Sequence, residues 1–116
     1  MVLDLTNSKM YWTDVDTDKI QRANLDGSNV EDLVTGLSDP FGIALDVAKG
    51  KMYWTDQYID KIQRADLDGS NVEDLVTTGL FSSIGIALDL GQMYWTDARI
   101  GKIQLTTTWG RIKSQQ

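Results

Sequence analysis

Cysteine and histidine are both absent from the 116 residues, and proline occurs only once. Without cysteine the chain forms no disulfide, and nothing in the composition indicates an oxidising compartment. The lack of both residues excludes histidine-based acid–base catalysis, Ser-His-Asp triads and metal sites with His or Cys ligands. A glycine-rich phosphate loop is missing as well. We therefore expect no catalytic residues, no metal ligands and no cofactor.

Basic residues are outnumbered, with 11 Lys and Arg against 17 Asp and Glu, a net charge of −6 and a pI of about 4.4. A chain this acidic is repelled by phosphate backbones and anionic membranes, so nucleic acid is not an expected partner. No window approaches the roughly 18 apolar residues of a membrane span, so we expect no membrane insertion. The opening MVLDLTNSKMYW predicts no secretory signal peptide, because it lacks a basic region and an apolar core.

An internal repeat dominates the sequence. KMYWTD occurs at residues 9–14 and 51–56, and QMYWTD follows at 92–97. Aligning residues 9–35 with 51–77 gives 23 identities in 27 positions at an offset of 42. GIALD occurs at 42–46 and again at 85–89. A period near 42 is typical of four-stranded propeller blades and of some helical arrays.

The pattern inside each period favours strands. The second period contains four short runs: FGIALDV (41–47), KMYWTD (51–56), KIQRADL (61–67) and NVEDLVTT (71–78). They are apolar, aromatic-rich or alternating, and none has the 3.6-residue spacing of a helix. LDGSN, between the third and fourth runs, predicts a hairpin turn. The sequence thus predicts an all-β chain of three four-stranded antiparallel blades, at residues 1–35, 40–78 and 83–114.

Alternation within the repeated hexapeptide predicts which side chains form the core. Met10, Trp12 and Asp14 fall on one side of the sheet, and Tyr11 and Thr13 fall on the other. Blades in a ring are covered on both faces. We therefore expect the repeated aromatic pairs to fill the space between blades rather than to form a ligand cage: Tyr11, Trp12, Tyr53, Trp54, Tyr94 and Trp95.

With its three YWTD units, its GIALD runs and KIQRADLDG, the chain resembles the YWTD repeats of the low-density lipoprotein receptor, also called class B repeats. The resemblance covers residues 1 to about 105. It implies a six-bladed β-propeller that is usually extracellular and binds other proteins, although this chain carries neither a signal peptide nor cysteine. Three blades make half of such a ring.

Repeated acids offer a possible metal site. Asp14, Asp56 and Asp97 end the YWTD runs, and Asp4, Asp46 and Asp89 end the GIALD-type strands. Six acids at equivalent positions could surround a central metal. We favour hydrogen bonds to backbone amides or to Arg22 and Arg64, because buried carboxylates need such partners. The acidic stretch 66–74 lacks the spacing of an EF-hand loop, so calcium is a minor possibility.

The differences between repeats gather in two kinds of connection: VDT, QYI and ARI after the second strand of each blade, and residues 35–41 and 77–84 between blades. In a blade of alternating strands both kinds emerge at one end of the ring. Aromatic and Arg side chains flanked by acids are enriched in binding sites. We expect a ligand-binding surface there, formed by Tyr58, Ile59, Asp16, Arg99, Ile100, Phe41 and Phe81; the alternative is that these loops have merely drifted.

A half-ring exposes two broad apolar flanks, and a two-fold homodimer would cover both. The third repeat departs from the others at that seam, because Leu105 replaces the arginine seen at Arg64 and TTTWGRI replaces ADLDGSN. We expect Trp109, Ile112 and Leu105 to line the dimer seam. The alternative is that residues 106–116 are a frayed end or unrelated sequence.

Three classes of function remain. The sequence favours a non-catalytic scaffold that binds a protein or peptide ligand. A calcium-dependent hydrolase of the propeller type is a second possibility, and its acids would have to converge at the mouth of the ring. A third is a fragment or duplication relic without a ligand of its own.

Overall fold

Twelve strands form three four-stranded antiparallel sheets in the computed structural model, which describes residues 1–78, 80, 83–89, 91–97, 102–107 and 112–115. The first sheet contains β1 (Val2–Asp4), β2 (Lys9–Asp14), β3 (Lys19–Asn24) and β4 (Glu31–Val34). The second contains β5 (Pro40–Asp46), β6 (Lys51–Asp56), β7 (Lys61–Asp66) and β8 (Glu73–Val76). The third contains β9 (Ser83–Asp89), β10 (Gln92–Asp97), β11 (Lys102–Thr107) and β12 (Ile112–Gln115). The predicted all-β architecture is confirmed.

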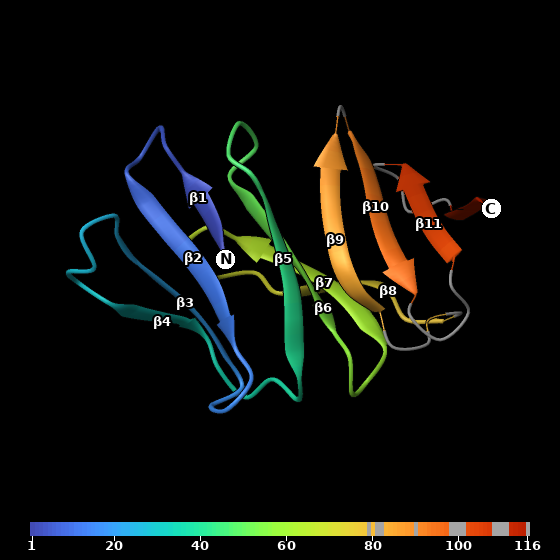
Figure 1. Ribbon diagram of the computed structural model, residues 1–116, viewed down its shortest axis with the longest axis horizontal. Coiled ribbons are helices and arrows are strands. Elements are labelled where there is room, and N and C mark those ends of the chain that lie inside the picture. Colours follow the sequence, from blue (N-terminus) through green and yellow to red (C-terminus); the bar gives the residue numbers. More distant parts are fainter. Residues whose placement is uncertain (79, 81–82, 90, 98–101, 108–111, 116) are drawn as a thin grey trace.

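Each sheet is a simple meander in which consecutive strands pair. The three sheets lie side by side in Figure 1, and β5 lies next to both β1 and β9. The fourth strand of each sheet is therefore the outermost one. Within the described part of the chain, nothing helical is long or apolar enough to cross a membrane.

The repeats keep the same pairing register. Tyr11 lies opposite Arg22 in the first sheet, and Tyr53 lies opposite Arg64 in the second. The outer strands are shorter than predicted. β8 begins at Glu73 rather than at residue 71, because Asn71 has a left-handed backbone with φ of 56° that interrupts an extended strand.

Two apolar layers hold the sheets together, and the YWTD side chains lie in both. Between the first and second sheets, Tyr11 packs in one cluster with Met52 and Trp54. Between the second and third, Tyr53 packs against the cluster that contains Met93 and Trp95. Tyr11 and Tyr53 thus face the next sheet, and the Met and Trp side chains of the second and third sheets face the previous one. The predicted inter-blade core is confirmed for these residues.

A repeated polar chain ties Trp12 and Trp54 to the outer strand of their own sheets. In the second sheet the Trp54 indole N–H donates to Oε1 of Gln63 at 3.2 Å. Nε2 of Gln63 donates to Asp74 at 2.8 Å, and Nζ of Lys61 binds the other oxygen of Asp74 at 2.9 Å. The first sheet repeats this arrangement, starting with a bond from Trp12 to Gln21 at 3.1 Å. A buried indole N–H needs an acceptor, and this glutamine supplies it.

Candidate recognition surface

Two kinds of connection meet at the lower edge of the molecule in Figure 1, as expected from the alternation of strands. The backbone N–H of Leu37 donates to the carbonyl of Asp18 at 3.1 Å. The backbone N–H of Gln57 donates to the carbonyl of Asp39 at 2.9 Å. The turns after β2 and β6 are thus bonded to the β4–β5 linker. We call this connected surface the loop end; it comprises residues 15–18, 35–41 and 57–60.

Asp56 is the buried centre of the loop end. Its carboxylate accepts hydrogen bonds from the linker amides of Ser38 at 3.0 Å and Asp39 at 3.1 Å. It also accepts from the turn amides of Tyr58 at 3.2 Å and Ile59 at 3.4 Å. The side chain is fully buried, so all four bonds are shielded from water. One carboxylate therefore fixes the turn after β6 against the linker.

Large apolar side chains project from this fixed backbone. Tyr58 is 79% exposed and Phe41 is 50% exposed, and Ile59 and Val15 are also open to solvent. Asp16 is exposed beside Val15. The sequence analysis did not single out Val15, although it belongs to the variable tripeptide VDT. The other predicted surface residues, Phe81, Arg99 and Ile100, lie outside the described residues.

The acids around the loop end remain ionised near neutral pH. The hydrogen bond from the Thr17 amide, helped by the Thr17 hydroxyl, lowers the pKa of Asp14 below its ordinary value. The hydrogen bond from Lys19 lowers the pKa of Asp32, and the one from Lys61 lowers the pKa of Asp74. Asp32 and Asp74 are neutralised by their ion pairs with Lys19 and Lys61, so the negative charge beside the apolar side chains comes from Asp14 and Asp16.

The idea that six repeated acids surround one metal is wrong for the first two sheets. Asp4 lies opposite Lys9 at the start of β2, whereas Asp14 is the last residue of the same strand, at its opposite end. Antiparallel pairing thus sends the two sets of acids to opposite ends. Among the residues that the structure describes, no group of three or more potential ligands could hold a metal ion.

These acids bind backbone amides instead, as the sequence analysis favoured. Asp4 accepts from the amide of Asn7 at 3.1 Å, and Asp46 accepts from that of Lys49 at 3.2 Å.

The alternative arginine partners are not the ones observed. Nε of Arg22 binds Glu31 at 2.6 Å, and Nε of Arg64 binds Glu73 at 2.7 Å.

The predicted seam residues lie in or near the third sheet. Leu105 is in β11 opposite Tyr94, the register position that Arg22 and Arg64 hold in the other sheets. Ile112 is the first residue of β12. Trp109 lies outside the described residues.

Residues 8–47 and 50–90 match the family model for low-density lipoprotein receptor repeat class B. The chain belongs to this family. Among curated proteins with class B repeats, low-density lipoprotein receptor-related protein 4 of Homo sapiens, Mus musculus and Rattus norvegicus is 57% identical over 37 residues. That stretch is 31% of this chain and 2% of the relative, so the chain spans a small part of the relative's length.

Solved structures extend the likeness to most of this chain. A chain in the crystal structure of the nidogen–laminin complex superposes with a TM-score of 0.87 at 35% identity, over 92% of this chain and 43% of that one. Virginiamycin B lyase from Staphylococcus aureus superposes with a TM-score of 0.74 over 93% of this chain and 37% of that one. At 20% identity, the lyase supports the fold alone. Both matched chains are more than twice as long as the matching part.

Proposed function

We propose that this chain is a non-catalytic protein-binding scaffold whose ligand docks on the loop end. The observation that carries the proposal is Tyr58, which is 79% exposed on a turn that the buried carboxylate of Asp56 holds in place. Holding an aromatic anchor on a fixed backbone lowers the entropy cost of binding. Tyrosine is also enriched among residues that dominate binding energy.

Charge and the relatives indicate the class of ligand. The ionised acids around the apolar side chains favour a protein or peptide segment with basic residues flanking an apolar one. The similar structure in the nidogen–laminin complex is itself part of a protein–protein complex. These points support a macromolecular ligand rather than a small substrate.

A displayed library of random peptides tests the docking surface without a known ligand. We expect enriched peptides to lose at least about ten-fold in affinity for Tyr58→Ala, the effect of removing a central aromatic anchor. Leu5→Ala is the matched control, because Leu5 is 73% exposed in the turn between β1 and β2 at the opposite end. Peptides that lose affinity for the Leu5 variant and keep it for the Tyr58 variant would refute the proposed surface.

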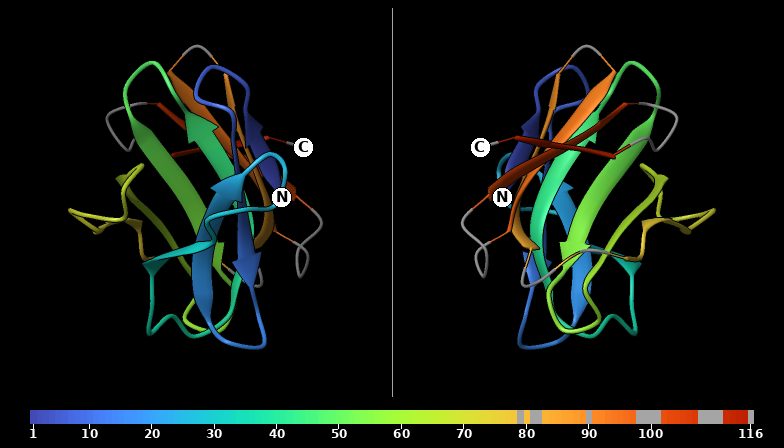
Figure 2. Two further views of the ribbon diagram at one scale, coloured as in Figure 1. Left: turned by 90° about the vertical axis from the view of Figure 1, so that its left-hand side faces the viewer. Right: turned by 90° about the vertical axis from the view of Figure 1, so that its right-hand side faces the viewer.

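We also propose that the three sheets are successive blades, at residues 1–35, 40–78 and 83–114, of one half of a six-bladed ring that a second copy completes. Figure 2 views the two terminal flanks. On the flank of the first sheet, Trp12 is half-buried, whereas its equivalent Trp54 is fully buried between sheets. On the flank of the third sheet, Thr96 is exposed, whereas Thr55 is fully buried. The two flanks thus correspond to the two halves of an inter-sheet seam.

Light scattering tests the assembly. Two 13.0 kDa chains give about 26 kDa, and an interface of this obligate kind should bury about 2,000 Å² or more in total. A 13 kDa particle that persists at high protein concentration would contradict the two-fold ring.

A further inference from the structure

The turn between β7 and β8 rests directly on the outer strand of the first sheet. A Cβ atom built on Gly69 would lie 2.1 Å from the carbonyl oxygen of Leu33 in β4, so no larger residue fits. Nη1 of Arg22 in β3 donates to the carbonyl of Leu67 at 3.0 Å, and Leu67 packs against the apolar core. The turn is therefore one of the contacts that join the first two sheets.

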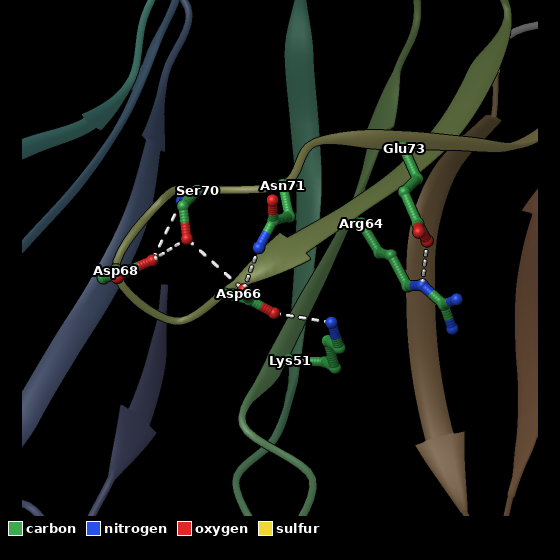
Figure 3. Close-up of polar contacts among 7 residues, drawn as sticks. All are labelled: Lys51, Arg64, Asp66, Asp68, Ser70, Asn71 and Glu73. Carbon is green, nitrogen blue, oxygen red and sulfur yellow. Dashed lines mark hydrogen bonds and ion pairs between the residues drawn. The ribbon is translucent and has the colours of Figure 1, made fainter.

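The same turn has a well-defined internal structure. Figure 3 shows Asp66, Asp68, Ser70 and Asn71 bonded to one another within it. The amide of Gly69 donates to the carbonyl of Asp66 at 2.9 Å and closes the turn. Its shape thus comes from its own sequence as well as from its neighbour.

The first sheet carries a copy of this turn, which makes no such contact. Its amide of Gly27 donates to the carbonyl of Asn24 at 2.9 Å, and φ of Gly27 is 87° against 88° for Gly69. A Cβ atom on Gly27 would meet nothing within 4 Å, and Leu25 is 43% exposed where Leu67 is packed. The turn of the first sheet thus has the same backbone shape as the docked turn of the second, although a Cβ atom on its glycine would have open space.

The first sheet also has an uncovered apolar face. Met10 is half-buried and Leu3 is 51% exposed, whereas Met52 is fully buried. The corresponding side chains of the second sheet, which include Met52, Trp54 and Leu45, pack against the first sheet. The first sheet therefore carries the same two features, a turn and an apolar face, with which the second sheet packs against the first.

We propose that the turn Leu25–Val30, here called the tongue, docks against the backbone of the outer strand β12 in a second copy of this chain. This inference rests on the proposed two-fold ring and identifies one of its contacts. The occupant is a second copy because the chain also carries the complementary flank. On that flank Ala87 and Thr96 are exposed, and a hollow of about 380 Å³ is lined by Gly85, Ile86, Ala87, Tyr94, Trp95 and Thr96.

The proposed receptor of the tongue differs from the internal seam in its outer strand and at one arginine. β12 reads IKSQ where β4 reads EDLV, and it pairs with β11 without the register shift that interrupts the β3–β4 pair. Leu105 occupies the register position of Arg22 in the third sheet, so the partner has no guanidinium for the carbonyl of Leu25. The contact that remains is between backbones, because Gly69 approaches a main-chain carbonyl. An arginine at position 105 should supply the missing bond.

Sedimentation measurements of the dimer Kd test the tongue. In Gly27→Asn, asparagine tolerates the left-handed backbone and finds open space in a single copy, but its side chain would collide with a docked outer strand. We expect the Kd to rise by about 100-fold or more. Gly36→Asn is the control, since Gly36 has φ of 73° with nothing within 4 Å and lies in the β4–β5 linker. Urea unfolding of both variants at low concentration checks that the single copies are equally stable.

Leu105→Arg provides the opposite test. A hydrogen bond from a charged donor should lower the dimer Kd by about ten-fold. A wild-type dimer with the same Kd in Gly27→Asn and Gly36→Asn would overturn the tongue and leave the two-fold ring standing. Failure of Leu105→Arg to tighten the dimer would also overturn it. A wild-type chain that stays at 13 kDa would overturn both the ring and the tongue.

Discussion

Asp56 and Asp14 end identical hexapeptides, yet their surroundings differ. Asp56 is fully buried and accepts four backbone hydrogen bonds from two segments. Asp14 accepts from the amides of Asp16 and Thr17, within its own turn. The first carboxylate therefore joins neighbouring parts of the fold, and the second shapes one turn.

This contrast predicts unequal effects of the same substitution. Asp56→Ala leaves four amides without their acceptor, and we expect the free energy of unfolding to fall by about 3 kcal/mol or more. Asp14→Ala should cost much less, because water replaces the lost acceptor. Urea titrations of both variants measure the difference. Equal losses would show that Asp56 does not act as the link between segments.

Asp66 and Asn24 are the equivalent residues of two otherwise similar turns. Nζ of Lys51 binds Asp66 at 2.5 Å, and Nζ of Lys9 binds the neutral side chain of Asn24 at 2.6 Å. The hydrogen bond from Lys51, followed by that from Asn71, lowers the pKa of Asp66. The carboxylate of Asp66 therefore stabilises the folded state only at pH values at which it is ionised.

This pKa shift predicts a dependence on pH. Because the folded pKa is lowered, the contribution of Asp66 is complete above the ordinary Asp pKa of about 3.9 and is lost as pH falls through the lower folded value. We expect the stability advantage of wild type over Asp66→Asn to shrink steadily between about pH 5 and pH 2. Thermal unfolding across this range measures it. An advantage that stays constant with pH would contradict the assignment to Asp66.

At the scale of strands, the bond from tryptophan to glutamine joins the second strand of a sheet to the third. Trp54 and Gln63 are both buried, whereas the equivalent Trp12 is only half-buried. Gln63→Leu would leave the indole N–H of Trp54 without a partner and away from water. We expect a loss of about 2 kcal/mol in unfolding free energy, against less than about 1 kcal/mol for Gln21→Leu.

Chemical denaturation of these two variants provides the measurement, with near-ultraviolet circular dichroism to follow the tryptophans. A larger loss in Gln21→Leu than in Gln63→Leu would show that burial does not govern the cost of the unpaired indole.

The repeat allowed the strands to be predicted from sequence, because each run could be checked against its copy. KMYWTD at residues 9–14 and 51–56 became β2 and β6 with the predicted bounds. The two hexapeptides are identical and so could not by themselves predict that Trp12 is half-buried and Trp54 fully buried; only the expected open flanks of a half-ring predicted a difference. That difference depends on which sheet lies alongside. Exposure of Val15 and the seat of Gly69 on Leu33 likewise depend on neighbours distant in sequence.

At the scale of the whole molecule, the two terminal flanks determine whether thermal stability depends on protein concentration. If a second copy covers them, folding and association are linked by mass action. We expect the melting temperature to rise with protein concentration and the transition of Gly27→Asn to depend on concentration far less. Calorimetry over a hundred-fold concentration range measures both. A wild-type transition that does not move with concentration would contradict the linkage.

Gly69 meets the carbonyl of Leu33, an atom that every residue type supplies. A duplicated repeat therefore contains both the docking turn and a main-chain carbonyl that can receive such a turn, whatever side chains its outer strand carries. Successive repeats can therefore differ in the side chains of their outer strands and still pack against one another. Fusing this 116-residue segment head to tail should accordingly give a single polypeptide in which both junctions are already compatible.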